Sequence, residues 1–235
     1  MNAHYNISNC GDHAVTVELG DAIDLATHQK IIALFNQLSN THIAGLRDVI
    51  PAYTTITVVY DIAAIKKVTS AAAYKYISEQ IEKAISECDW KKESLLSDIN
   101  IPVCYDISLG IDLPEMSKQK EIPIEEIISI HTSATYNVYM LGFLPGFAYM
   151  GIVDDKIATP RLSKPRTNVP AGSVGIAGNQ TGIYPLDSPG GWNIIGQTPL
   201  QMFDAKKEKP CLVKPGDRIK FIPISLDEFH QQKLA

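Results

Sequence analysis

Two arginines of this chain stand where they could bind an anion. Arg161 and Arg166 lie five residues apart, and each directly follows a proline, Pro160 and Pro165. Because proline fixes the backbone before each arginine, a rigid presentation of both guanidinium groups is expected. The planar guanidinium donates paired hydrogen bonds that suit phosphate or carboxylate. We therefore predict that both arginines bind a phosphoryl group or a substrate carboxylate. The alternative is that they hold loops to nearby carboxylates or carbonyls.

The residues that follow these arginines are almost uncharged. Between residues 167 and 199 the only charged side chain is Asp187. The neutral hydrogen-bonding side chains that suit an amide ring or the edge of adenine are Gln180, Thr181, Tyr184 and Thr198. Interface cores are depleted in charge, and burying an unpaired charge costs several kcal/mol or more. We interpret this stretch as the lining of a β-barrel and also as a face that contacts a partner protein.

Glycines in the same half of the chain are further candidates. Gly146, Gly190 and Gly191 could let the backbone approach a ligand closely, since glycine has no side chain to block it. Tight turns are the competing explanation for each of them, because turns are the commonest use of glycine.

Aromatic residues flank these glycines. Tyr139, Phe143, Phe147 and Tyr149 surround a Pro-Gly turn, and Trp192 follows the second glycine pair. Aromatic rings here either form the wall of a ligand groove or fill the core of a barrel, where an indole needs a partner for its N–H group. We include Phe147, Tyr149 and Trp192 among the candidate substrate-binding or ATP-binding residues.

Several common chemistries have no counterpart in the sequence. It contains no Gly-x-x-x-x-Gly-Lys-Ser/Thr phosphate loop, no His-Glu-x-x-His and no Gly-x-Ser-x-Gly. The four cysteines form no Cys-x-x-Cys pair, so no metal site or disulfide framework is predicted. His131 lies on an apolar helical stripe, where a structural histidine and an acid/base are the alternatives.

Charge and hydropathy limit the partners of the protein. The net charge is −5 with a pI near 5.7, and no cluster of lysine and arginine occurs. These values argue against nucleic acid or an anionic membrane as the main partner. No segment approaches the ~18 consecutive apolar residues of a membrane span, and the N-terminus lacks a signal-peptide pattern. We expect a soluble, cytoplasmic protein whose partner is a small molecule or another protein.

The first hundred residues and the rest of the chain follow different patterns. Strands are predicted at 13–19, 53–61 and 99–106, with a helix capped by Asp24 and another over 70–88. This alternation predicts an α/β layer structure with helices on one face of a sheet, in a split β-α-β arrangement. Residues 142–199 contain ten of the fifteen glycines and seven of the fourteen prolines, which with short apolar strands is typical of a β-barrel or sandwich. Ser225 and Glu228 predict a capping box.

Four motifs together resemble one known family. They are YNVYMLGFLPGFAYMG at 136–151, PRLSKPRTNVPAGSVGIAG at 160–178, QTGIYPLDSPGGWNIIGQTPL at 180–200 and KPGDRIKF at 214–221. In order and spacing they are similar to the family of the 5-oxoprolinase B subunit, which is also described as allophanate hydrolase subunit 1 and includes the Kip-type sporulation-kinase inhibitor. The resemblance covers essentially the whole chain. Leu109 and Met116 depart from it, because more polar and smaller residues are expected there.

The resemblance implies a fold and an activity. It implies a ferredoxin-like α+β domain over 1–105, a helical connection over 106–135 and a cyclophilin-like β-barrel domain over 136–235. It further implies a subunit, inactive alone, of an enzyme that hydrolyses 5-oxo-L-proline to L-glutamate with cleavage of ATP, together with Mg²⁺ and with 5-oxoprolinase subunits A and C. Arginines and backbone N–H groups would stabilise the charge that develops in such a reaction.

Two other functions are consistent with the same motifs. The chain could be a regulatory protein that inhibits a sensor histidine kinase, as the Kip-type member does. It could also be a subunit of an ATP-dependent carboxylase system for urea derivatives, which would need a partner chain because no biotin-type Met-Lys-Met segment is present.

Overall fold

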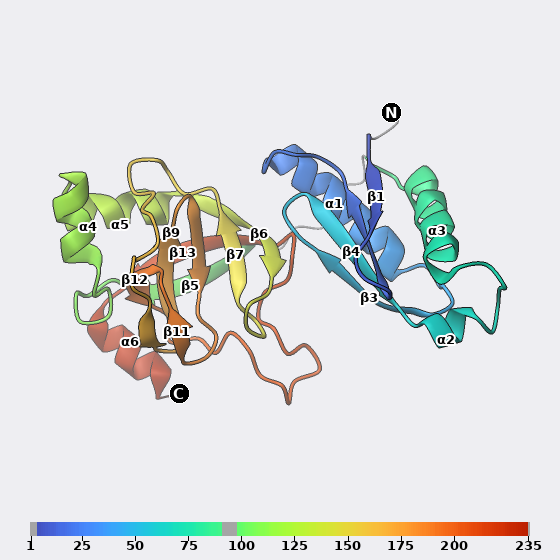
Figure 1. The fold of residues 1–235 in the computed structure, drawn as a ribbon. Helices are drawn as coiled ribbons and strands as arrows, with labels where there is room; N and C mark the ends of the chain where they lie inside the picture. Colours follow the sequence, from blue (N-terminus) through green and yellow to red (C-terminus); the bar gives the residue numbers. More distant parts are fainter. Residues whose placement is uncertain (1–3, 91–97, 235) are drawn as a thin grey trace. The chain divides into compact units, whose positions relative to one another are not determined.

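The protein consists of two compact units in the computed structural model (Figure 1). The structure describes residues 4–90 and 98–234. The first unit spans residues 1–95 and the second spans residues 96–235. Each unit has a hydrophobic core of its own and is described separately below.

The first unit is a four-stranded antiparallel sheet with helices. The strands occur in the order β1-β2-β4-β3 and comprise β1 (Asn6–Asn9), β2 (Ala14–Glu18), β3 (Leu46–Pro51) and β4 (Thr55–Tyr60). Its helices are α1 (Leu25–Ser39), α2 (Ile62–Ile65) and α3 (Ala73–Glu87). The predicted cap of α1 is confirmed, because the Asp24 carboxylate accepts a hydrogen bond from the backbone N–H of Thr27 at 2.7 Å. The sequence patterns missed β1, β3 and α2.

One face of this sheet is buried under the helices. In β4 the side chains of Ile56, Val58 and Tyr60 are buried and alternate with half-buried residues, as expected for a sheet covered on one side. Helix α1 packs on β3 and β4, whereas α3 packs on β2 and on α1. The predicted α/β layer structure is therefore present, and its ferredoxin-like assignment stays a prediction.

The second unit is built around a closed barrel of seven strands. Around the barrel the order is β10-β7-β6-β13-β5-β12-β9. The strands are β5 (Asp98–Cys104), β6 (Thr135–Leu141), β7 (Ala148–Gly151), β9 (Ser173–Ala177), β10 (Gln180–Ile183), β12 (Asn193–Gln197) and β13 (Arg218–Ile224). A separate two-stranded sheet pairs β8 (Arg166–Val169) with β11 (Ser188–Gly190). Every residue of β9 and β12 is buried, so the near absence of charge over 167–199 follows from the packing of this chain itself.

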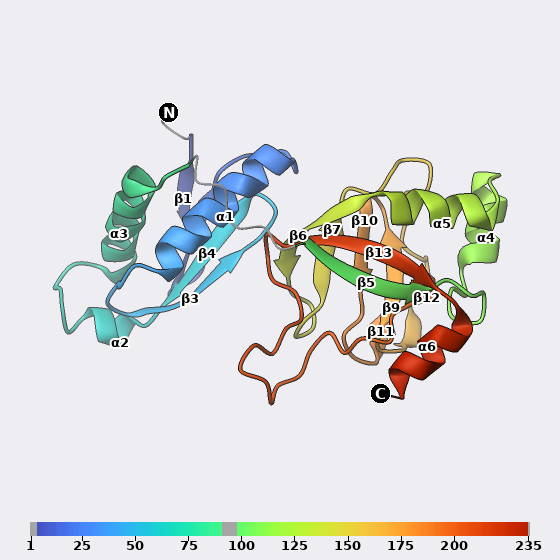
Figure 2. The ribbon, with the colours of Figure 1, turned by 180° about the vertical axis from the view of Figure 1, so that it is seen from behind.

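The boundary between the units differs from the sequence-based one. We expected the first domain to extend to residue 105, but β5 belongs to the barrel, where it runs parallel to β13 and pairs with β12 (Figure 2). The expected connection over 106–135 is also part of the barrel unit. Its helices α4 (Leu113–Lys120) and α5 (Ile124–Ser133) pack on each other, on β12 and on β13. A local strand pattern shows that a strand forms but does not show which sheet it joins.

The barrel unit ends in helix α6 (Leu226–Lys233). Its predicted capping box is confirmed, since the Ser225 hydroxyl accepts from the Glu228 backbone N–H and the Glu228 carboxylate accepts from the Ser225 backbone N–H.

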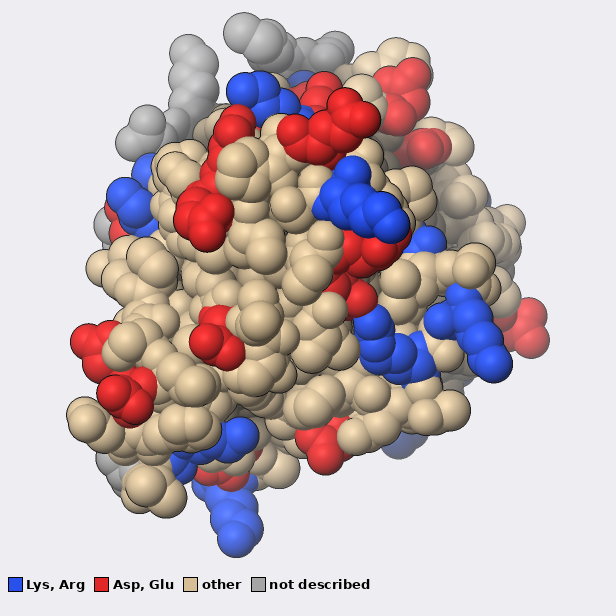
Figure 3. Space-filling model, turned by 90° about the vertical axis from the view of Figure 1, so that its left-hand side faces the viewer, with Lys and Arg blue, Asp and Glu red and all other residues tan. Residues whose placement is uncertain are grey.

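No helix in the described part of the chain is long and apolar enough to cross a membrane. On the face shown in Figure 3, acidic and basic side chains are scattered among uncharged ones and form no continuous basic area.

Candidate functional site

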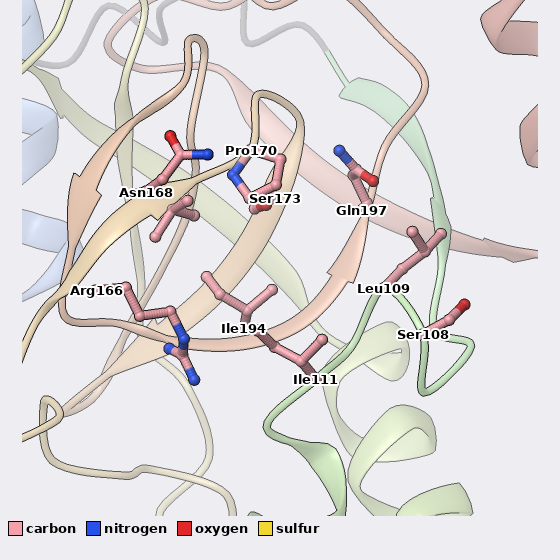
Figure 4. A pocket seen from close by; sticks show the side chains of 10 residues that line it. Ser108, Leu109, Ile111, Arg166, Asn168, Pro170, Ser173, Ile194 and Gln197 are labelled. Carbon is pink, nitrogen blue, oxygen red and sulfur yellow. The ribbon is translucent and has the colours of Figure 1, made fainter.

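The barrel unit has a pocket at the edge of the β8–β11 sheet. Its volume is about 80 Å³. Four parts of the chain form its wall: the loop that precedes α4, strand β8 with the proline after it, the start of β9, and β12 (Figure 4). Loop 108–111 contributes Ser108 and two apolar side chains, and strands β8, β9 and β12 contribute both polar and apolar ones.

An ion pair lies in the wall of this pocket. The Arg166 Nη2 group donates to the Asp112 Oδ1 atom at 2.5 Å, and Arg166 Nη1 contacts the carbonyl oxygen of Trp192 at 3.4 Å. The other carboxylate oxygen of Asp112 accepts from the backbone N–H of Ile194 at 2.6 Å. The exposed fractions of the two side chains are 28% for Arg166 and 11% for Asp112, so the pair is largely shielded from water. Asp112 thereby ties the loop before α4 to β8 and β12.

Sequence reasoning missed Asp112. It lies directly before Leu113 and Pro114, where an aspartate is usually interpreted as a helix cap. In the structure its side chain makes no cap hydrogen bond to α4. Its partner Arg166 is 54 residues away along the chain, so no local pattern could have paired them. Arg166 therefore pairs with a carboxylate and holds a loop, which was the alternative to anion binding.

Arg161 lies in different surroundings from Arg166. It is exposed and does not line the pocket. Its guanidinium carbon lies 5.9 Å from the centre of the Trp192 ring, which is within the range of a cation–π contact. The structure thus places the two arginines in separate environments.

The predicted aromatic residues form a packed cluster. Phe147 lies at its centre, with ring centroids at 4.8 Å from Tyr149, 5.1 Å from Tyr184 and 5.4 Å from Trp192. Phe147, Tyr184 and Trp192 are buried, and burial raises the pKa of the Tyr184 hydroxyl above its usual value. Of the two alternatives, these rings fit a barrel core. We call this group, together with Val169, Ala177 and Ile194, the aromatic cluster.

The candidate glycines allow close packing within the chain. A Cβ atom at Gly190 would lie 2.4 Å from the Tyr184 hydroxyl, and one at Gly146 would lie 2.8 Å from the Cβ atom of Phe203. Gly146 also has a φ of +83°, a conformation that favours glycine. A Cβ atom at Gly191 would lie 3.5 Å from the Pro165 ring, an ordinary contact distance. Contacts with their own chain account for Gly146 and Gly190.

Thr181 belongs to a buried hydrogen-bonded network. Its hydroxyl lies 3.1 Å from the Gly175 carbonyl, to which it donates, so it must accept from the Nε2–H group of His131 at 3.0 Å. The other ring nitrogen, Nδ1, then accepts from the Tyr105 hydroxyl at 2.8 Å. Desolvation lowers the pKa of His131 to about 3, and the ring stacks on Phe221. His131 is therefore neutral and structural, which was one of its two predicted roles.

The remaining candidates also lie outside the pocket. Gln180 begins β10 and is half-buried, whereas Thr198 is buried and accepts from the backbone N–H of Leu200 at 3.3 Å. Of the twelve residues that the sequence proposed, Arg166 is the one that lines the pocket. Leu109 was noted only as a departure from the family pattern, and the sequence patterns did not single out Asn168 or Gln197.

The pocket does not fit a nucleotide. Its volume of about 80 Å³ is far below the roughly 300–1,000 Å³ of pockets that enclose drug-sized ligands. The described residues contain no group of three or more His, Cys, Asp or Glu side chains that could hold a metal ion. The expected ATP and Mg²⁺ therefore have no counterpart in this pocket.

Comparison with known proteins defines the class of the chain. Residues 5–213 match the model of the carboxyltransferase domain, subdomain C and D, and the chain belongs to this family. Its relatives include the 5-oxoprolinase B subunit of Bacillus subtilis, which is 38% identical over 99% of this chain and 98% of that protein. The 5-oxoprolinase B subunit of Escherichia coli O157:H7 is 36% identical over 91% of this chain and 93% of that protein. The family resemblance that the four sequence motifs indicated is thereby confirmed.

Solved structures agree with the fold. TTHA0988 is 32% identical with a TM-score of 0.78 over 90% of this chain, which spans 40% of that longer chain. The protein PH0987 of Pyrococcus horikoshii is 39% identical with a TM-score of 0.56, covering 95% of this chain and all of that one. The urea amidolyase of K. lactis, at 20% identity and a TM-score of 0.77, shares the fold over 98% of this chain and 15% of its own.

Proposed function

We propose that this chain is the B subunit of an ATP-dependent 5-oxoprolinase, a complex that opens 5-oxo-L-proline to L-glutamate. The observation that carries the proposal is the similarity to the 5-oxoprolinase B subunit of Bacillus subtilis along nearly the full length of both chains. Because the match covers 98% of that relative, each of its large domains has a counterpart in this chain.

The chemistry of the proposed reaction accounts for the need for a co-substrate. A five-membered lactam is a resonance-stabilised amide, and ATP cleavage would supply the free energy that opens it. Because the pocket beside Arg166 is too small for a nucleotide, we assign ATP and its Mg²⁺ to the assembled complex with subunits A and C. The complex is expected in the cytoplasm.

Two observations support companion subunits. This chain corresponds to 40% of TTHA0988 and to 15% of the K. lactis urea amidolyase, so in both proteins the similar region is joined to much additional sequence. In addition, Leu186 of the uncharged stretch is 42% exposed, which suits a contact with a partner. We propose that this part of the barrel meets the C subunit.

For the site on this chain we propose the pocket beside Arg166. Asp112 holds the guanidinium group in place, and the N–H groups that neither Asp112 nor the Trp192 carbonyl uses would bind substrate. Val169 and Ile194 belong both to the pocket wall and to the aromatic cluster, so Phe147, Tyr184 and Trp192 support the wall from behind. Arg161 lies at the exposed edge of that cluster.

Reconstitution tests the proposed function. The purified chain alone should have negligible activity, and mixing it with subunits A and C should produce glutamate and ADP together. Full turnover by the isolated chain would contradict its assignment as one part of a complex, and an assembled complex that forms neither product would contradict the activity.

The role of Arg166 is tested in the same assay. Arg166→Lys keeps the charge but loses the fork that pairs with Asp112, so turnover per assembled complex should fall by a factor of ten or more, about 1.4 kcal/mol. Arg161→Lys is the matched control, with turnover close to that of the unchanged chain. Near-normal turnover of both assembled variants would remove Arg166 from the site.

A further inference from the structure

Exposed aliphatic side chains border the pocket beside Arg166. Ile107 is 60% exposed and Ile111 is 49% exposed, although they stand only four positions apart. Ile111 lines the pocket, and Ile107 directly precedes the other wall residues of the same loop. A single exposed isoleucine needs no explanation, but two of them at the edge of a pocket indicate a surface that another molecule covers.

Loop 106–111 has a fixed conformation in the chain itself. The carbonyl oxygen of Asp106 accepts from the backbone N–H groups of Leu109 at 2.8 Å and Gly110 at 2.7 Å, and the Asp106 carboxylate accepts from the Ser108 N–H at 2.9 Å. A Cβ atom at Gly110 would lie 2.4 Å from the carbonyl oxygen of Ile195, so the loop packs closely on β12. Because the loop is already ordered, a partner that covers its two isoleucines loses little conformational entropy on binding.

A third exposed aliphatic side chain, that of Leu186, is connected to another side of the pocket. Asp187 accepts from the backbone N–H of Ala171 at 2.7 Å, and Ala171 follows Pro170, which lines the pocket. Figure 4 shows Pro170 and Leu109 on different sides of the pocket. A surface that contacts both Leu186 and the loop with the two isoleucines therefore spans the pocket opening.

The pocket of this chain is too small to be a complete substrate site. A volume of about 80 Å³ corresponds to the space of two to three water molecules at roughly 30 Å³ each. A five-membered lactam that carries a carboxylate does not fit in this space. The wall that encloses the rest of the substrate must therefore come from a second surface.

The charge beside the two isoleucines restricts the partner. The exposed carboxylate of Asp106 lies next to Ile107 in the sequence and in the same loop. A complementary surface has an apolar hollow for the isoleucines and a lysine or arginine at its border. Leu186 belongs to the face that we assign to the C subunit, so one continuous contact with that subunit reaches the pocket.

We propose that the C subunit covers the opening of this pocket, receives Ile107 and Ile111 in an apolar hollow, and supplies the missing part of the pocket wall. The identity of the partner rests on the proposed function. The site would then be complete only in the assembled pair of subunits.

Binding of the purified C subunit to the full chain, measured by isothermal titration calorimetry, tests this proposal. Ile107→Asp should weaken binding about thirtyfold or more, because it places a charge in the apolar part of the contact. In the unchanged chain, amide hydrogen exchange should slow over loop 106–111 and over residues 184–188 when the C subunit is added. Urea denaturation of the free variant shows whether it is folded.

Ile152→Asp is the matched control. Ile152 is 52% exposed in the same unit and follows Gly151, which pairs with Gln180. Gln180 also pairs with Ala177 at the end of β9, whereas the pocket uses Ser173 at the start of that strand. The control therefore adds the same charge at the other end of β9, and its binding of the C subunit should equal that of the unchanged chain.

Three results would overturn the proposal. The first is equal affinity of the two folded variants for the C subunit. The second is a loss of binding to the A subunit but not to the C subunit in Ile107→Asp, which would identify the A subunit as the occupant. The third is a change in self-association of Ile107→Asp, measured by analytical ultracentrifugation, which would identify a second copy of this chain.

The two proposals can fail separately. A fully active complex that contains Ile107→Asp with unchanged affinity for the C subunit would refute the contact and leave the 5-oxoprolinase assignment in place. A loss of affinity confined to Ile107→Asp, in a system whose unchanged complex forms no glutamate, would refute the assignment and leave the contact.

Discussion

The pocket and the aromatic cluster are neighbouring regions of one barrel with opposite character. Both draw on residues 166–197, and Val169 and Ile194 belong to both. In the pocket, a loop from before α4 brings an aspartate to an arginine and leaves polar groups accessible. In the cluster, the rings of Phe147, Tyr184 and Trp192 pack against each other. The comparison shows that aromatic side chains, which are suited to ligand binding, have a structural role in this barrel because they are buried in its core.

The largest effect on stability is expected from removing one ring from the aromatic cluster. Trp192→Ala should lower the free energy of unfolding by about 3–5 kcal/mol, because it removes a ring that is only 4% exposed and contacts Phe147 and Tyr149. Urea denaturation measures the change. Phe143→Ala, a 62% exposed ring beside the same cluster, should cost less than about 1 kcal/mol. Similar losses in both variants would show that Trp192 is not a core residue.

The next largest effect is expected from breaking the ion pair in the pocket wall. Both oxygens of Asp112 accept hydrogen bonds, so in Asp112→Asn the amide nitrogen would face either Arg166 or the Ile194 N–H group, both of which are donors. We expect a loss of about 2–3 kcal/mol in the free energy of unfolding, measured by urea denaturation.

Asp155→Asn is the matched control for this substitution. Asp155 is exposed in the same unit, and its replacement should change stability by less than about 0.5 kcal/mol. An Asp112→Asn protein as stable as this control would mean that the pair does not hold the loop to the barrel.

The pH dependence of stability reports on His131, a neutral polar group in the barrel interior. The pKa of His131 is lowered to about 3 by burial, whereas its value in the unfolded chain is about 6.5. Between these values the unfolded chain binds a proton that the folded chain does not. Stability should therefore fall as the pH drops below about 6.5, with a contribution of about 1.4 kcal/mol per pH unit.

His131→Gln isolates this contribution, because glutamine does not titrate. The variant will be less stable at neutral pH, but its stability should fall less steeply between pH 6.5 and 4 than that of the unchanged chain. The measurement is a set of urea denaturation curves across this pH range. Parallel pH profiles would show that His131 titrates normally and that the interior is open to protons.

The smallest effect is expected at the exposed edge of the aromatic cluster. Arg161 is exposed and contacts Trp192 at 5.9 Å, so Arg161→Ala should cost about 0.5–1 kcal/mol in thermal denaturation. A loss as large as that of Asp112→Asn would mean that the two arginines have equivalent structural roles after all.

The sequence predicted the elements better than their assembly. The Asp24 cap of α1, the helix at Ala73–Glu87 and the capping box at Ser225 were all anticipated, because each depends on residues within a few positions of one another. Strand β5 was recognised as a strand but assigned to the wrong unit, since its partner β13 lies more than a hundred residues later. Of the candidate site, Arg166 was found and Asp112 was not, for the same reason.

What the sequence by itself determined was the class of elements, the barrel character of the second half and the family. Those properties follow from local propensity and from motifs whose residues are adjacent in the chain. The tertiary structure decided which candidates became core and which line a pocket. In the folded chain Tyr184 and Trp192 are buried, and Asp112 offsets the charge of Arg166. Ser173 and Gln197 lie together in the pocket wall. Burial and pairing depend on contacts between residues far apart in sequence, and a charge or polar group acquires its chemistry only from such neighbours.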